Sequence, residues 1–186
     1  MELVIPSFYR MLTTGMLLWI GRKKEDILAL SVKPDGTKAL SDLRLLTVYH
    51  PTHYPEPMDP SLLYVLVYGG PSLGWIDGQP REATVEYRLM KGTQIQAPSG
   101  PAAIVADAPM LGDIVEALLV ELSQLGKGQP GRSTVYWPNG VLEDDDLERH
   151  CRLQRADVSY HPSLTGLDGN ALDAIAYRMM CNFTVG

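Results

Sequence analysis

The sequence predicts an α+β fold, in which a β-rich mixed or antiparallel sheet carries one well-defined amphipathic helix and one or two shorter helices. Two observations lead to this class. Short apolar runs bounded by Gly, Pro and Asp turns fill residues 27–105, as expected of strands. Leucine, isoleucine and valine then recur at helical spacing over about residues 108–125. No linker or internal repeat divides residues 1–186, so we expect a single domain.

The first third of the chain contains one ambiguous segment. Residues 7–20 are apolar, and Ser7 is a suitable N-cap for a helix over them. The Thr-Thr-Gly at 13–15 fits a pair of strands equally well, so the sequence leaves helix and strand open. Residues 27–32 are expected to form a strand that enters the turn at Pro34-Asp35-Gly36.

The middle of the chain predicts most of the sheet. Leu43–Tyr49 and Leu62–Tyr68 are almost continuously apolar, which is typical of strands buried on both faces. We expect Gly69-Gly70-Pro71 to end the second of these strands. Asp77-Gly78 then predicts a hairpin turn, and Thr84–Leu89 alternates like a half-buried strand.

The last half of the chain is expected to begin with two short strands and the amphipathic helix. That helix starts near Asp107, buries its leucine-rich face and exposes Asp113, Glu116 and Glu121. The short strands before it are at 93–96 and 102–105. The later elements are strands at 133–137 and 156–160, a short helix at 143–154, and a segment at 172–185 that changes from helix to strand near Met180.

Charge and cysteine content narrow the function. The 16 basic and 22 acidic residues give a net charge of −6, which argues against direct binding of nucleic acid. Cys151 and Cys181 have no CxxC spacing and indicate a reducing compartment, with free buried thiols favoured although spacing leaves a disulfide open. The apolar segment Met11–Ile20 is too short to span a membrane, and its flanking charges are in the wrong order for a signal peptide. We therefore expect a cytoplasmic or virion location and no membrane partner.

The four histidines form the one candidate metal site. His50 and His53 lie in a proline-rich loop at 50–60, and His150 and His161 lie near the end of the chain. If the two loops meet, three imidazoles and a thiolate could bind zinc. Histidines in proline loops are more often surface or interface residues, so we treat metal binding as an alternative and expect no cofactor. No nucleophile motif or phosphate-binding loop has the required spacing, and no catalytic residue is predicted.

Large side chains next to turns predict a protein interface. Aromatic residues and methionine are enriched at such interfaces. The candidates are Tyr49, Tyr54, Met58, Trp75 and Trp137.

From Asp107 to Gly186 the arrangement resembles the tail-terminator and neck (tail-completion) proteins of tailed phages. The resemblance rests on the amphipathic helix, the Arg155–Val158 strand, the Gly-Leu-Asp-Gly-Asn turn at 166–170 and the closing Tyr177–Val185. It implies a small ring-forming protein without a catalytic site, and it carries over no functional residue.

Three functions follow from these observations. The leading hypothesis is a non-enzymatic assembly subunit of a homo- or hetero-oligomer, such as a tail or neck component of a virion, whose partners are other protein subunits. The second is a small metal-dependent enzyme that uses the histidine clusters. The third is a monomeric acidic binding module, of the immunity-protein or chaperone type, that meets a basic partner.

Overall fold

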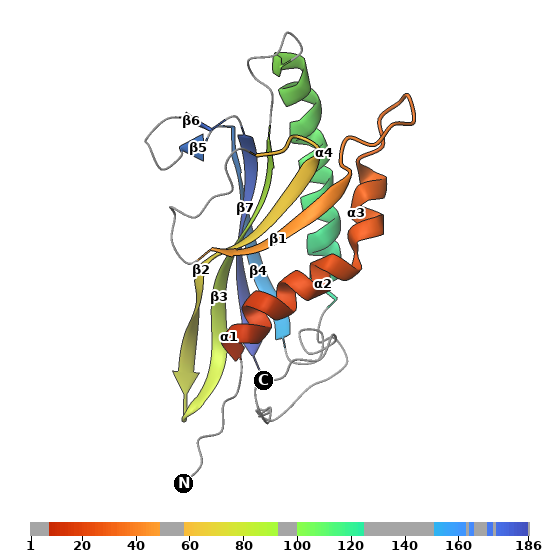
Figure 1. Ribbon diagram of the computed structural model, residues 1–186. Coiled ribbons are helices and arrows are strands. Elements are labelled where there is room, and N and C mark those ends of the chain that lie inside the picture. The colour runs from red at the N-terminus through yellow and green to blue at the C-terminus, as the bar shows by residue number, and fades with distance from the viewer. Residues whose placement is uncertain are drawn as a thin grey trace.

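The computed structural model describes residues 8–48, 58–92, 100–124, 151–162, 164–165, 171–172 and 174–185. Its centre is a five-stranded mixed sheet (Figure 1). From one edge to the other the strands are β1 (Asp42–Val48), β2 (Leu62–Ile76), β3 (Gln79–Gly92), β7 (Ala174–Val185) and β4 (Cys151–His161). β1 is parallel to β2, and the other neighbours are antiparallel. β5 (Leu164–Thr165) and β6 (Ala171–Leu172) form a separate two-stranded sheet.

The helices cover one face of the large sheet and confirm the α+β class (Figure 1). α1 (Phe8–Arg10), a π-helical segment η1 (Met11–Gly15) and α2 (Met16–Arg22) follow one another directly and form one continuous helix. The ambiguous segment 7–20 is therefore helical from Phe8 onward. α3 (Lys24–Leu30) follows, and α4 (Gly100–Leu122) is the long helix.

The main core lies between the helices and the sheet. It contains Trp19 and Ile20 from α2, Leu118 and Leu122 from α4, and alternate residues of the strands. At its centre the buried Tyr87 of β3 donates a hydrogen bond from its hydroxyl to the carbonyl oxygen of Leu12, at 2.9 Å. This bond gives the one polar group of Tyr87 a partner inside an apolar layer.

A second, smaller apolar cluster lies on the opposite face of the sheet. Because strand side chains alternate between faces, it takes the other set of positions on the same strands. Leu63 to Val67 of β2 are all buried, which confirms the prediction of burial on both faces there. The same prediction is wrong for β1, where Arg44 and Thr47 are exposed, since β1 is an edge strand. The second cluster contains Tyr64, Leu66, Met90 and Ala176.

The predicted amphipathic helix is correct in its buried face and wrong in its start. Leu111, Ile114, Leu118 and Leu122 are buried, as expected. The helix begins at Gly100, so residues 102–105 are helical and not a strand. Residues 100–108 are rich in alanine, the strongest helix former, and Pro101 lies in the first turn, where no backbone N–H is needed. Pro109 lies inside the helix and does not end it.

Two further predictions are wrong in the first half of the chain. Residues 27–30 belong to the helix α3, whose first turn carries Glu25 and Asp26 next to the positive end of the helix dipole. Gly69-Gly70-Pro71 does not end β2. The strand continues through a β-bulge between Tyr68 and Ser72, where Gly69 has a φ of 72°.

Two predictions of helix near the C-terminus are also wrong, because the residues form strands. Residues 151–154, expected in a helix, begin the strand β4. Residues 174–185 are strand throughout, because β7 pairs with β3 on one side and β4 on the other, and this pairing overrides the helix propensity of Ala, Arg and Met. The expected strands at 93–96 and 133–137, and the helix at 143–150, lie outside the described residues.

Candidate interaction surfaces

The β2–β3 hairpin extends beyond its neighbours in the sheet. The last residue of β2 that pairs with β1 is Tyr68, and the first residue of β3 that pairs with β7 is Glu82. Within the described residues, the segment 74–81 therefore forms a two-stranded ribbon with no third strand (Figure 1). A two-stranded ribbon is only marginally stable without contacts to other parts of a structure.

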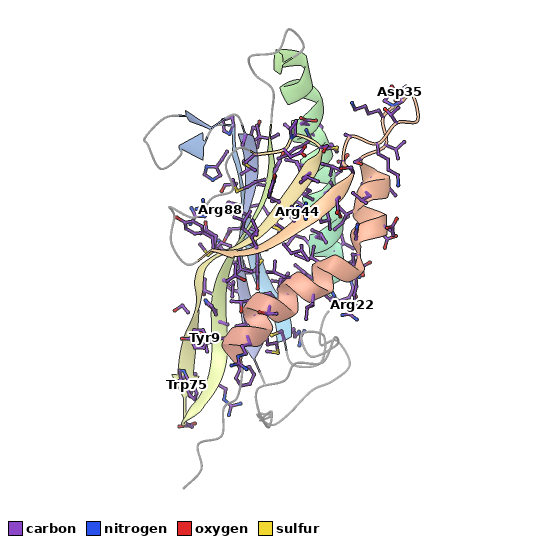
Figure 2. The ribbon with its side chains drawn as sticks, viewed as in Figure 1. Tyr9, Arg22, Asp35, Arg44, Trp75 and Arg88 are labelled. Carbon is purple, nitrogen blue, oxygen red and sulfur yellow. The ribbon has the colours of Figure 1, made fainter. Side chains whose placement is uncertain are left out.

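Apolar side chains lie at the end of this ribbon. Trp75 is 54% exposed and Ile76 is 53% exposed, immediately before the turn (Figure 2). Asp77 and Gly78 both have positive φ, 53° and 73°, as in a type I′ turn, which confirms the hairpin turn predicted at these residues. The ribbon therefore has a well-defined turn that presents an indole ring and a branched aliphatic chain to solvent. We call Trp75 and Ile76 the hairpin tip.

An apolar groove of about 420 Å³ lies between α4 and the sheet edge β4. Its walls include Leu119 and Val120 from the helix and Val158 and Tyr177 from the strands. Gly112 allows the helix to approach, because a Cβ there would lie 3.1 Å from the Tyr177 hydroxyl. Among the described strands β4 is the last of the sheet, so the groove lies next to a sheet edge.

A second cleft, of about 530 Å³, separates α4 from the turn that follows α3. Asp107 and Asp113 line one side and Asp35 lines the other. Asp107 is buried and forms an ion pair with Lys91, with 2.8 Å between Oδ2 and Nζ. The Asp35 pKa is lowered by its hydrogen bonds from the Thr37 hydroxyl and backbone N–H. Two of the three carboxylates therefore already have partners of their own.

Charged residues cluster on the sheet face that the helices do not cover. Glu86 is buried and forms ion pairs with Arg178 and Arg88. The Arg88 guanidinium stacks on the Tyr68 ring, with 3.7 Å from the guanidinium carbon to the ring centroid, a cation–π contact that fixes its orientation. Glu86 neutralises part of the arginine charge, so the cluster has an internal structural role.

Of the four predicted metal ligands, the described residues include His161 alone, so the metal site stays a prediction. His161 ends β4, and its Nε2 lies 3.1 Å from the Ser159 hydroxyl, while His50, His53 and His150 lie outside the described residues. No group of three or more His, Cys, Asp or Glu within the described ranges could hold a metal ion.

The predicted interface residues have different environments. Met58 is half-buried against the small apolar cluster of its own chain, so it contributes to the fold. Trp75 is exposed at the hairpin tip, as an interface residue must be before assembly. Tyr49, Tyr54 and Trp137 lie outside the described residues.

Both cysteines are free and buried, as the sequence led us to expect. Burial raises the Cys181 pKa to about 12 and also raises the Cys151 pKa. Both thiols are therefore protonated at neutral pH, which makes them poor nucleophiles.

Comparisons with known proteins give no family for this chain. No family model matches the sequence, and no curated protein matches it. Among the described residues, no helix is both long and apolar enough to cross a membrane.

Sequence reasoning missed the groove and its neighbouring helix face. The alternation of Val158 and Tyr160 with polar residues indicates a strand with one apolar face, but not that the strand is an edge. A valine at position 120, between the acidic residues of α4, is the sequence feature that could have indicated an apolar patch on the outside of this helix.

Proposed function

We propose that this protein is a non-enzymatic structural subunit of a homo-oligomer, and that its hairpin tip packs against a neighbouring copy. The observation that carries the proposal is the projecting ribbon with Trp75 and Ile76 half-exposed at its end. An indole ring at an exposed turn costs solubility unless a partner covers it. Tryptophan is also the residue type most enriched among the energetic centres of protein interfaces.

The remaining described surfaces support a binding role. The groove beside β4 is apolar, and the buried ionisable groups Lys91, Asp107 and Glu86 each have a partner within the fold. Each of these groups is thus engaged in an ion pair of the fold, which supports a structural role for them.

The resemblance to tail-terminator and neck proteins extends the proposal to a tail or neck ring of a phage particle. Two elements that carry it, α4 and the closing strand β7, are present in the fold. Within the described residues the sheet ends at β1 and β4, and two such edges suit a subunit that contacts neighbours on both sides.

The native mass of the purified chain tests the proposal. Light scattering over a hundredfold range of protein concentration should give a single species at a multiple of 20.5 kDa. A mass of 20.5 kDa at every concentration would contradict the homo-oligomer.

A further inference from the structure

The outer surface of the helical layer has two stripes of opposite charge. The continuous helix Phe8–Arg22 contains two arginines and no acidic residue. The helix α4, Gly100–Leu122, contains four acidic residues and no basic residue. Both helices pack on the same face of the sheet, so their outer sides point in the same direction, away from it (Figure 1).

The first stripe, which we call the basic stripe, follows the exposed side of α1, η1 and α2. Tyr9, next to Arg10, is 54% exposed, and Leu18, between Arg10 and Arg22, is 42% exposed. Figure 2 shows Tyr9 and Arg22 at the two ends of this helix. The complete basic stripe is Tyr9, Arg10, Thr14, Leu18 and Arg22, all exposed.

The second stripe, which we call the acidic stripe, follows the exposed side of α4. Asp113 and Glu116 form no ion pair with any other residue in the described part of the chain. Glu121 contacts Lys23 of its own chain, with 3.4 Å between Oε2 and Nζ. Val120, 57% exposed, lies between these carboxylates and borders the apolar groove. The complete acidic stripe is Asp113, Glu116, Ala117, Val120 and Glu121.

We propose that the helical layers of two copies of this chain pack face to face, so that the basic stripe of each copy meets the acidic stripe of the other. The partner of the acidic stripe is then a second copy of the chain. This inference rests on the proposed homo-oligomer. A two-fold axis is the natural relation, because both stripes lie on one surface and a single two-fold contact satisfies both pairs at once.

Area and shape are consistent with this contact. Helices of 15 and 23 residues, each about 10 Å wide, offer on the order of 1,100 Å² over both copies, near the lower limit of about 1,200 Å² for stable interfaces. The groove beside Val120 gives the apolar side chains of the basic stripe a place to pack. Charge complementarity would then select the pairing of unlike stripes over like ones.

Two substitutions at exposed positions test the contact. Thr14→Glu places an acidic residue in the middle of the basic stripe, and Glu116→Lys places a basic residue in the acidic stripe. Each should raise the dissociation constant of the two-fold contact at least about tenfold and halve the native mass under conditions where the wild type is assembled. Thr14→Lys is the matched control, because it has a long side chain at the same site but keeps the sign of the stripe, and its mass should equal that of the wild type.

Mixing the two disruptive variants gives the most specific readout. In a two-fold contact, the new glutamate of one chain meets the new lysine of the other, and the unchanged stripes also match. The 1:1 mixture should therefore recover the wild-type mass, although neither variant does so alone. Recovery also shows that both chains are folded, since an unfolded chain could not restore the contact.

The outcomes separate this inference from the proposed function. If the wild type is oligomeric and both Thr14→Glu and Glu116→Lys have the same native mass as the wild type, the proposed helix contact is wrong. The assembly role would still stand in that case. Loss of mass that mixing does not restore would also overturn it. A wild type that is monomeric at all concentrations would overturn both proposals.

Discussion

The two halves of the β2–β3 hairpin have opposite relations to the rest of the molecule. The half nearest the turn, residues 74–81, has no third strand beside it within the described chain, and its apolar residues Trp75 and Ile76 are half-exposed. The other half lies inside the sheet, where Leu63 to Val67 are completely or almost completely buried between two apolar clusters. The same two strands are thus a core element at one end and a surface element at the other.

This difference indicates which part of the hairpin is a candidate for function. The apolar side chains from Leu63 to Val67 have a structural reason, because each belongs to one of the two clusters. The hairpin tip fills neither cluster. This contrast between the two halves is the basis of our proposal that a neighbouring copy covers Trp75 and Ile76.

The largest expected effect belongs to the inner half. Leu63→Ala removes three carbons from a fully buried site and should lower the free energy of unfolding by about 2–5 kcal/mol. Urea unfolding followed by circular dichroism measures this change. A loss of less than about 0.5 kcal/mol, as at a surface site, would remove the contrast between the two halves.

The next prediction tests the burial of the inner half through the pH dependence of stability. Cys181 pairs with Val85 of the inner half, and burial raises its pKa from 9.0 to about 12. A raised pKa means that the protonated form is favoured in the folded state. The contribution of the protonated thiol to stability is therefore fully present below pH 9. As the pH rises above 9, the free energy of unfolding falls, by about 1.4 kcal/mol at pH 10 for each buried thiol.

Unfolding titrations from pH 7 to pH 10 check this expectation. The Cys151→Ala, Cys181→Ala variant is the control and should lose most of the decline between these limits. A wild type whose stability does not change over this range would show that the thiols ionise as easily in the folded state as in the unfolded chain.

A smaller effect is expected for the hydroxyl of Tyr87. Tyr87→Phe keeps the ring in the core and removes only the hydrogen bond to the Leu12 carbonyl, which should cost about 1 kcal/mol. The same urea titration measures it. No change at all would indicate that the π-helical segment satisfies that carbonyl without Tyr87.

The parts of this fold that sequence could predict are those that local patterns determine. The buried face of α4 follows from leucines at helical spacing, and the I′ turn follows from Asp77-Gly78. The failures have a common cause, which is that tertiary pairing decides between local alternatives. β7 contains good helix formers but has a partner strand on each side, and β2 continues past Gly69 because a bulge absorbs the glycine.

The candidate surfaces show the same limit. Sequence singled out Trp75 as a large residue beside a turn, and it lies exposed at the hairpin tip. It did not distinguish Trp75 from Met58, which packs within its own chain. The sequence did not reveal the charge stripes, because it left helix and strand open for residues 7–20. Arg10 and Arg22 can be assigned to one helix only once α1, η1 and α2 are known to be continuous.

The smallest effect on stability is expected at the hairpin tip, and it accompanies the largest effect on assembly. Trp75→Thr with Ile76→Thr keeps strand propensity in the ribbon and should change the free energy of unfolding by less than about 1 kcal/mol. The decisive measurement is the native mass of this double variant by light scattering, beside the wild type at the same concentration. We predict a lower mass than that of the wild type with the fold intact. An unchanged mass would contradict the central claim that the hairpin tip exists for a neighbouring subunit.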